Sequence, residues 1–406
     1  MSVYTQPKGL NLKLKSLSIV ALLSSFVCFG NESNKPAPEI LDLYTKNPFN
    51  FIERIIPDLE NGFVDSTPID RKDGIPVGEL GVDGGDKNMI FKFAQENKDL
   101  YDSMLISYKG KLIFESYYLR GRINLPHEQQ SATKSYTSIA LGRAIQLGYL
   151  TMADLDKPVA SFLKDLNLKR LVEGASNITL HQAMTMSSGI RISKNKRKEL
   201  LKNPAQLKGQ GRVQSYLEHS APISAKSQTF YYSNFDSSMV MQVLDAVVPG
   251  TVENFIKNEV FDKLGISVYG WRLDISGLPI AGYGSSMTSR DMLKWGTLVI
   301  NNGEWNGKQL ISKAFIAKAT SKIVKNPNTD WLPDGLDFTY GYFWWQTEMK
   351  VGDKTYICKF AWGGLGQLIF VLEELDLTVV VTAHDGAIED KFLLLMPEKI
   401  LPAFVK

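Results

Sequence analysis

Hydrophobic residues follow strand-like spacing and helix-like spacing in separate parts of the chain. Residues 103–118 contain two runs rich in β-branched and aromatic residues on either side of a turn at Gly110, which predicts a β-hairpin. Apolar positions in residues 131–150 recur at helical spacing and stop near Gly148. This second pattern predicts a helix that begins at or just after Ser131.

Strand-like runs return near the C-terminus, before a final helix predicted at about residues 388–396. These runs are residues 343–347, 355–361, 367–372 and 377–383. The region between the two strand-rich parts, about residues 135–335, shows mostly helical patterns, clearest at 252–264 and 289–300. An antiparallel sheet built from about residues 91–130 and 340–406, flanked by terminal helices and carrying an inserted mainly α-helical region, fits this order. The predicted fold class is therefore α/β of the α+β kind.

The first thirty residues are typical of an export signal. A stretch with three lysines precedes an apolar run at residues 17–29, which is too short to span a bilayer. We expect cleavage after Gly30 and a periplasmic or secreted mature protein. An uncleaved anchor and lipid attachment at Cys28 are the alternatives. Residues 31–90 are rich in Pro, Asp, Asn and Gly and predict an irregular extension, followed by one large domain at 91–406.

Charge and cysteine usage narrow the function classes. Removal of residues 1–30 removes three lysines and no acidic residue, so the formal net charge falls from +3 to 0. Nothing in this balance favours nucleic-acid binding. Cys358 is then the remaining cysteine, and it lies in an apolar alternation that predicts a buried strand rather than a catalytic thiol.

The sequence has no His-Glu-x-x-His metal motif, no Walker nucleotide-binding loop and no Gly-x-Ser-x-Gly nucleophile elbow. The four histidines are scattered without ligand spacing, so the sequence predicts no metal and no cofactor. His384 follows a predicted strand and is interpreted as part of a turn without a catalytic role. The Ser-x-x-Lys pattern remains, in three copies that begin at Ser131, Ser161 and Ser193.

Ser-x-x-Lys is suited to nucleophilic catalysis because a hydroxyl needs a nearby base to accept its proton. Residues three apart share a helix face, and burial near a helix N-terminus favours a neutral lysine. Ser161 lies in a predicted surface turn, and Ser193 opens a basic run typical of a solvated face. Ser131 and Lys134 start a long amphipathic helix directly after sheet. From this motif alone, a nucleophile and an ordinary N-cap serine are equally good interpretations of Ser131.

Several segments resemble landmarks of the class C β-lactamase, penicillin-binding protein and esterase superfamily. The resemblance covers about residues 95–400, and the landmarks occur in the family's order. They are Ser131-Ala-Thr-Lys-Ser-Tyr-Thr-Ser138, Thr179-Leu-His-Gln-Ala-Met-Thr-Met-Ser-Ser-Gly189, Tyr232-Ser-Asn234, Gly284-Ser-Ser-Met-Thr-Ser-Arg-Asp291 with Asn306-Gly307, and Tyr340-Gly-Tyr-Phe-Trp-Trp345. The resemblance implies that Ser131 is the acylated nucleophile and Lys134 its proton acceptor. It further implies that Tyr232 shares the proton transfer and that Asn234 orients the lysine or the substrate.

The family's third motif is changed in this chain. Where relatives carry Lys or His followed by Thr or Ser and Gly, the sequence reads Ala361-Trp-Gly-Gly-Leu-Gly-Gln367, which resembles esterase-type members and the 6-aminohexanoate oligomer hydrolases. Trp362 and Gly363 are substrate-binding candidates, although packing on the sheet is an equally good interpretation of Trp362. The backbone N–H of Gly364 or Leu365 would complete an oxyanion hole with Ser131. Trp344 and Trp345 are expected to pack rather than bind.

The missing cation changes the expected substrate, because that cation helps to hold a substrate carboxylate in the family. An uncharged small-molecule ester, amide or peptide bond therefore becomes the expected target of an exported serine hydrolase. A β-lactamase or DD-peptidase is the first alternative. A binding or sensor module that keeps the fold without turnover is the second. None of the three needs a membrane span in the mature chain.

Overall fold

A computed structural model describes residues 57–59, 62, 67–327, 329–386 and 389–405. The described residues all belong to one compact unit. The predicted signal peptide, its cleavage after Gly30 and the alternative lipid site at Cys28 lie outside the described residues. No helix among the described residues is long and apolar enough to cross a membrane.

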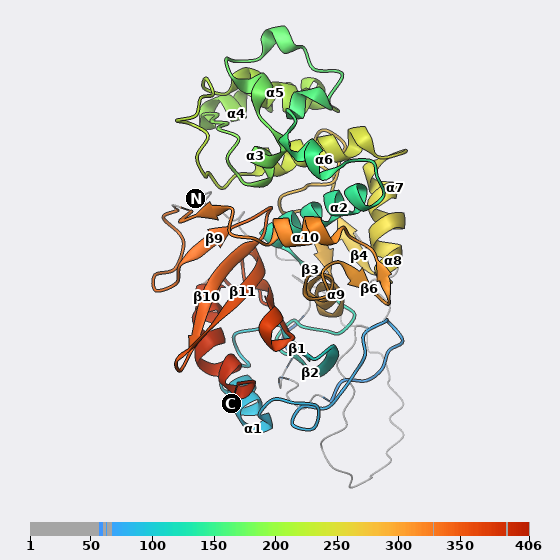
Figure 1. The fold of residues 1–406 in the computed structure, drawn as a ribbon, viewed down its shortest axis with the longest axis vertical. Coiled ribbons are helices and arrows are strands. Elements are labelled where there is room, and N and C mark those ends of the chain that lie inside the picture. The colour runs from blue at the N-terminus through green and yellow to red at the C-terminus, as the bar shows by residue number, and fades with distance from the viewer. Residues whose placement is uncertain (1–56, 60–61, 63–66, 328, 387–388, 406) are drawn as a thin grey trace, which may run out of the picture. The chain divides into compact units, whose positions relative to one another are not determined.

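An eight-stranded sheet is the main β element, and every neighbouring pair in it is antiparallel (Figure 1). Its strand order is β2-β1-β13-β12-β11-β10-β9-β8. The strands are β1 Ser103–Tyr108, β2 Lys111–Tyr117, β8 Val324–Lys325, β9 Phe338–Tyr340, β10 Trp345–Val351, β11 Lys354–Gly363, β12 Gln367–Leu372 and β13 Leu377–Thr382. The N-terminal hairpin thus joins the C-terminal strands in one sheet, as the sequence predicts.

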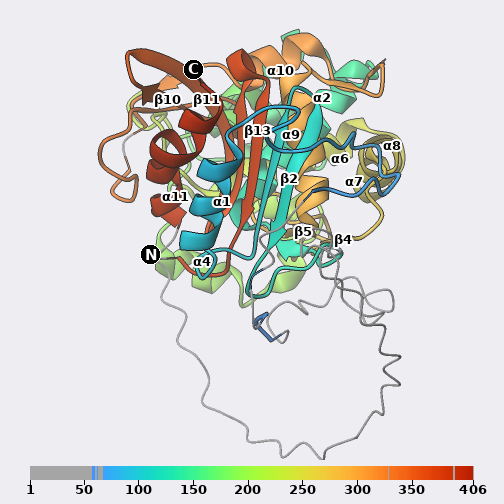
Figure 2. The same ribbon diagram turned by 90° about the horizontal axis from the view of Figure 1, so that it is seen from below.

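Helices cover both faces of this sheet. Figure 2 shows α1 (Lys87–Glu96) and α11 (Glu389–Leu395) on one face and α9 (Ser289–Ile300) on the other. All residues of β12 and β13 are buried, which explains why these strands are apolar without alternation. The approach of α9 is close, since a Cβ on Gly296 would lie 2.5 Å from Thr378 Cγ2. Both the antiparallel sheet and its flanking helices are confirmed.

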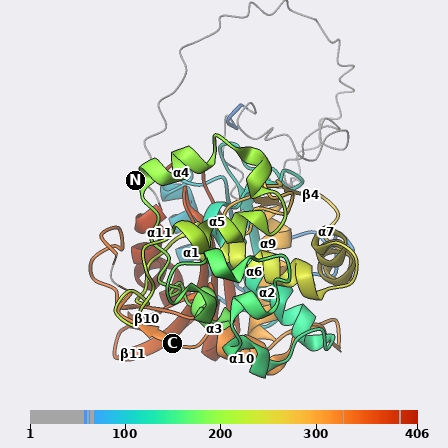
Figure 3. The same ribbon diagram turned by 90° about the horizontal axis from the view of Figure 1, so that it is seen from above.

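A mainly helical region lies between the β1–β2 hairpin and the later strands. Its helices are α2 Thr133–Gln146, α3 Leu180–Met184, α4 Lys194–Leu200, α5 Gly211–His219, α6 Asn234–Val247, α7 Val252–Ile256, α8 Asp262–Leu264 and α10 Lys313–Ala319, with a π-helical turn at Lys257–Phe261 between α7 and α8. Short 3₁₀ turns lie at Gln130–Ala132, Met152–Asp156, Val159–Ser161, Leu168–Arg170, Ala175–Asn177 and Pro204–Leu207, and further ones at Glu373–Leu375 and Leu401–Ala403. Figures 1 and 3 show α3, α4, α5 and α6 grouped together.

Two small sheets inside this region were not predicted. One has the order β3-β5-β4, formed by His127–Glu128, Ser285–Met287 and Tyr269–Trp271, and the other pairs β6 Glu304–Trp305 with β7 Lys308–Gln309. Strands of two or three residues leave no measurable alternation in a sequence. The predicted strand at 343–347 also starts too early, because Phe343 adopts a left-handed φ of 61° and β10 begins at Trp345.

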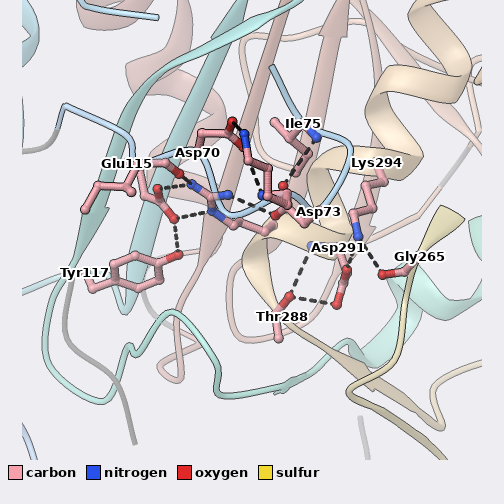
Figure 4. Close-up of polar contacts among 12 residues, drawn as sticks. Asp70, Asp73, Ile75, Glu115, Tyr117, Gly265, Thr288, Asp291 and Lys294 are labelled. Carbon is pink, nitrogen blue, oxygen red and sulfur yellow. Dashed lines mark hydrogen bonds and ion pairs between the residues drawn. The ribbon is translucent and has the colours of Figure 1, made fainter. Parts of the chain in front are cut away.

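The described part of the predicted extension, from residue 67 to the start of α1, is irregular and contacts the sheet and α9. Val77 forms a bridge with Leu112 of β2. The Arg290 guanidinium of α9 donates to both carboxylate oxygens of Glu115 (2.8 and 2.7 Å) and to Asp73 (2.9 Å). Figure 4 shows Asp73 and Glu115 drawn together in this network. A buried bidentate ion pair therefore joins α9 to the sheet, and Asp73 attaches the extension to the same guanidinium.

Candidate active site

Ser131 lies in a 3₁₀ turn, Gln130–Ala132, that connects β3 to α2. Backbone and side chain both hold the residue before this turn: Gln129 donates its N–H to Ser285 O (2.8 Å), and its amide oxygen accepts from the Tyr136 hydroxyl (2.6 Å). Gln130 has a left-handed φ of 47°, which is rare for a residue with a side chain and is typical of positions held under constraint. The turn therefore presents Ser131 in a fixed position.

Ser131 does not act as a helix cap. The cap position of α2 is Ala132, and no side chain caps the helix. The Ser131 hydroxyl instead accepts from Lys134 Nζ at 3.3 Å. The N-cap alternative left open by the sequence is thus wrong, and the pairing of hydroxyl and amine at i, i+3 is present.

Lys134 is buried, with 2% of its surface exposed. Its Nζ donates to the backbone carbonyl of Gly282 (2.8 Å) and lies 4.8 Å from the centre of the Tyr232 ring. Within the described part of the chain, no carboxylate forms an ion pair with Lys134. Because burial disfavours the charged ammonium, the pKa of Lys134 falls from 10.5 to about 7. A large fraction of the amine is therefore neutral near pH 7 and able to accept a proton.

Tyr232 and Asn234 lie at the start of α6. The Tyr232 ring is half-buried and packs 5.3 Å from Trp331 and 5.7 Å from Trp345, centre to centre. Asn234 is exposed, and its amide oxygen lies against Gly282, so that any side chain at position 282 would collide with it. Among the described residues, the hydrogen bonds of Lys134 include none from Asn234. The Gly282 carbonyl, which no sequence motif identifies, orients Lys134 in place of Asn234. A substrate-orienting role for Asn234 stays a prediction.

The glycine-rich end of β11 lies against the turn at Gln130–Ala132, which we call the nucleophile turn after the role predicted for Ser131. A Cβ on Gly363 would overlap the carbonyl oxygen of Gln129 and approach Ala132 N to 3.1 Å, so this position requires glycine. The chain then turns through Leu365 and Gly366, which have left-handed φ values of 69° and 94°. Gly364 borders the same cavity as Ser131, whereas Leu365 borders a neighbouring one. Of the two candidate oxyanion donors, Gly364 is the one that shares a cavity with the serine.

The cavity beside Ser131, which we call the nucleophile cavity after the role predicted for that serine, has a volume of about 190 Å³ and mostly aromatic walls. Its lining residues are Ser131, Tyr232, Trp331, Trp345, Trp362 and Gly364. The three tryptophans contact one another with ring centres 5.3–5.7 Å apart. Trp345 packs as expected and also borders the cavity, whereas Trp344 is fully buried. Trp331 comes from a loop rich in Asp, Asn and Pro, and no sequence pattern identified it.

The remaining candidates lie where the sequence predicts, with one exception. Ser161 lies in an exposed turn and Ser193 caps the exposed helix α4, so neither is part of the nucleophile cavity. Cys358 is fully buried in β11, and burial raises its pKa well above the usual value. His384 is more than a turn residue, because its Nδ1 lies 2.9 Å from both oxygens of the buried Asp102 carboxylate. Among the described residues, no group of three or more His, Cys, Asp or Glu side chains is arranged to hold a metal ion.

Comparison with known protein families finds one matching family for most of the chain. The beta-lactamase family profile matches residues 101–392, which includes every residue of the nucleophile cavity. No curated protein sequence matches the chain significantly.

Solved structures with the same fold belong to several kinds of enzyme. A Bacillus anthracis protein assigned provisionally as a 6-aminohexanoate-dimer hydrolase is 17% identical over 88% of this chain and 96% of its own, with a TM-score of 0.60. A class C beta-lactamase is 16% identical over 79% of this chain and 95% of its own (TM-score 0.59). A D-stereospecific amidohydrolase from Streptomyces is 15% identical over 75% of this chain and 98% of its own (TM-score 0.55). At these identities the likeness shows the fold and leaves the substrate to the chemistry of the cavity.

Proposed function

Because the chain belongs to the beta-lactamase family, whose members are serine hydrolases, we propose that it hydrolyses an uncharged ester or amide through an acyl-enzyme on Ser131. The observation that carries this proposal is the environment of Lys134. Its amine is buried, lies 3.3 Å from the Ser131 hydroxyl and has no carboxylate partner among the described residues. A buried lysine retained without a counter-charge has a cost in stability, and proton transfer is the function that best accounts for it.

In the acylation step, Ser131 Oγ attacks the substrate carbonyl carbon while neutral Lys134 takes the hydroxyl proton. The carbonyl oxygen becomes an oxyanion, which the backbone N–H groups of Ser131 and Gly364 stabilise. Collapse of this intermediate breaks the bond to the leaving alcohol or amine, which departs with the proton from Lys134. Tyr232 shares this proton transfer, since its ring lies beside the amine.

In the deacylation step, water attacks the acyl carbon and gives its proton to the neutral Lys134 amine. The bond between Ser131 Oγ and the acyl carbon breaks, the serine recovers its proton, and the carboxylic acid leaves. No cofactor takes part in this scheme.

The walls of the nucleophile cavity favour an apolar acyl group. Trp331, Trp345 and Trp362 offer ring surfaces and no charge, and a volume of about 190 Å³ corresponds to about six water molecules at roughly 30 Å³ each. A short aliphatic or single-ring acyl group matches this size and chemistry. The absence of a cation at Ala361 and Trp362 disfavours the carboxylate-bearing ring of a β-lactam on this side of the serine.

Labelling with a fluorophosphonate probe tests the nucleophile before any substrate is known. We expect one adduct, on Ser131, found by mass spectrometry and lost in Lys134→Met. Adducts on Ser161 or Ser193 would overturn the assignment, and no adduct would favour a binding module.

Substrate class is tested by comparing 4-nitrophenyl butyrate with a chromogenic cephalosporin. We expect the ester to be hydrolysed with the higher kcat/KM. A cephalosporin rate that far exceeds the ester rate would identify a β-lactamase instead.

Export is a separate part of the proposal. The N-terminal sequence pattern supports a signal peptide, and N-terminal sequencing of protein recovered from the periplasm or medium should begin at Asn31. A start at Cys28 with an added lipid mass would support the anchored alternative.

A further inference from the structure

A second cavity of about 270 Å³ adjoins the nucleophile cavity. We call it the histidine cavity, and its lining residues are Arg120, His127, Glu128, Leu365, Gln367, Ala383 and His384. The turn after β11 separates the two cavities, because Gly364 borders one and Leu365 borders the other. His127 and Glu128 form β3, which leads directly into the nucleophile turn. The mechanism above uses none of the polar side chains of this cavity.

A buried carboxylate organises the two histidines. Asp102 is fully buried and accepts the backbone N–H of Arg120 (3.0 Å). His384 Nδ1 lies 2.9 Å from both Asp102 oxygens, and His127 Nδ1 lies 3.9 Å from one of them. Both rings therefore turn Nδ1 toward the carboxylate and Nε2 away from it. The bond to Asp102 raises the pKa of His384 above the ordinary value, which favours an imidazolium that balances the buried charge.

Two buried polar atoms of this cavity lack partners. Among the described residues, His127 Nε2 and Gln367 Oε1 have no hydrogen-bond partner, although both side chains are more than nine-tenths buried. The Gln367 amide nitrogen donates to the carbonyl of Ala383, so its orientation is fixed. An unsatisfied buried polar atom costs about 1–3 kcal/mol and is rare in proteins. Two of them on the wall of one cavity indicate a polar occupant.

The charges around the cavity indicate that this occupant is an anion. Asp102 is balanced by His384, and Glu128 accepts from the Arg272 guanidinium at 2.7 Å. The Arg120 guanidinium has a longer contact, 3.7 Å, with the exposed carboxylate of Asp58. Burial lowers the pKa of His127, so its ring is neutral, and with Nδ1 turned toward Asp102 its Nε2 is a hydrogen-bond acceptor, like Gln367 Oε1. The cavity thus offers N–H donors from the Arg120 guanidinium and the His384 imidazolium, while its acidic groups are engaged elsewhere.

We propose that the histidine cavity binds a carboxylate, with Arg120 and His384 as donors, on the side of the β11 turn opposite the tryptophans. Guanidinium and imidazolium groups form short, charge-assisted hydrogen bonds with carboxylates. A volume of about 270 Å³ equals about nine water molecules at roughly 30 Å³ each, enough for a short-chain acid with a water molecule that donates to His127 Nε2 and Gln367 Oε1. The carboxylate belongs either to an extended substrate or to a free acid. This binding does not depend on the hydrolase activity proposed above.

The four histidines of the chain make this proposal testable by NMR. With the purified protein labelled at histidine, titration with butyrate at pH 6 should move the imidazole signals of His127 and His384. His181 and His219 lie outside the cavity and serve as internal references. Butyramide has nearly the same shape without the charge and should leave all four signals in place. Equal responses to butyrate and butyramide, or no response to saturating butyrate, would overturn the proposal.

Matched substitutions identify the donors. Arg120→Gln should weaken butyrate binding at least tenfold, while Arg197→Gln, which removes an exposed arginine of α4, should leave the dissociation constant unchanged. His384→Gln is a second variant, and circular dichroism should show whether it folds despite leaving Asp102 without its partner. A crystal soaked with butyrate that holds only water in the cavity, or equal affinities in Arg120→Gln and wild type, would count against the site.

Kinetics distinguish the two sources of the carboxylate. If it belongs to the substrate, 4-nitrophenyl hydrogen glutarate should be hydrolysed faster than 4-nitrophenyl valerate, and Arg120→Gln should remove the preference by raising KM. If it belongs to a free acid, the two esters should react alike, and butyrate should change kcat without competing with either.

Discussion

Two buried lysines of this protein share a spacing and differ in what surrounds them. Lys134 stands three residues after Ser131, and Lys294 stands three residues after Asp291. Each donates to one backbone carbonyl, of Gly282 and Gly265 respectively, at 2.8 and 2.9 Å. Figure 4 shows Lys294 with Asp291 and Gly265 in a closed set of contacts. Lys134 has a hydroxyl where Lys294 has a carboxylate.

The comparison separates a stabilising lysine from a reactive one. Lys294 is 1% exposed, and its charge is balanced at 2.9 Å by Asp291. This buried ion pair stabilises the N-terminal part of α9 beside Arg290. Lys134 is 2% exposed and lacks such a partner among the described residues, so burial favours its neutral form. Burial alone does not make a lysine basic at neutral pH; the absence of a carboxylate is also required.

The largest expected effect comes from Lys134→Met. We expect kcat/KM for 4-nitrophenyl butyrate to fall about 10³- to 10⁴-fold, because Ser131 loses its proton acceptor. The free energy of unfolding should stay equal or rise, since an uncompensated buried amine is replaced by an apolar side chain of similar length. Ester kinetics test the loss of activity, and urea unfolding tests the free energy of unfolding. A large loss of stability would mean that Lys134 is mainly structural.

Lys294→Met should give the opposite result. It leaves the Asp291 carboxylate buried without its counter-charge, which costs about 3–5 kcal/mol of unfolding free energy. The folded fraction should keep its kcat. The control is Asp291→Leu combined with Lys294→Met, which removes both charges and should recover most of the stability. A loss under about 1 kcal/mol in the single variant would place the pair with weak surface pairs.

The pH dependence of activity follows from the pKa of Lys134, which is about 7 in the folded protein and 10.5 for a lysine exposed in the unfolded chain. Below pH 7 the amine is protonated and cannot accept the serine proton, so kcat/KM should fall about tenfold per pH unit. Between pH 7 and 10.5 the unfolded chain binds one more proton at this site than the folded protein, so unfolding free energy should rise with pH. In Lys134→Met, the residual kcat/KM should lose its fall below pH 7, and the unfolding free energy should lose the part of its rise with pH that comes from Lys134. A pH–rate profile and urea unfolding at several pH values measure them.

How far the sequence predicts this fold depends on the length of each pattern. Strands β1, β2 and β10 to β13 of the large sheet and helix α9 follow from the longer apolar runs, and α9 begins and ends at the predicted residues. Strands β8 and β9 of the same sheet were not predicted, because they have only two and three residues. The sheet β3-β5-β4 escapes prediction because strands of two or three residues carry no period. That small sheet nevertheless holds the segment before Ser131.

The candidate site divides in the same way. Ser131, Lys134 and Tyr232 lie in motifs and are brought together as expected. Gly282 contributes only a backbone carbonyl, which no motif can specify. Trp331 and the pair of Asp102 with His384 depend on contacts between segments far apart in the chain, so their partners are visible only in the folded structure.

The smallest expected effect tests whether dryness around Lys134 sets its pKa. Trp331 is 40% exposed and packs on Tyr232, whose ring lies over the amine. Trp331→Ala should admit water, which raises the pKa of Lys134 and so shifts the acid limb of the pH–rate profile to higher pH by about half a unit. It should also raise KM for apolar esters about threefold, because an apolar wall is lost. Tyr149→Ala removes a similarly exposed ring (41%) far along the chain and should change neither. An unchanged acid limb in Trp331→Ala would show that Tyr232 and Trp345, which lie deeper, are sufficient to keep the pKa of Lys134 low. Lys134 would then stay neutral near pH 7 without Trp331, in contrast to the ion-paired Lys294.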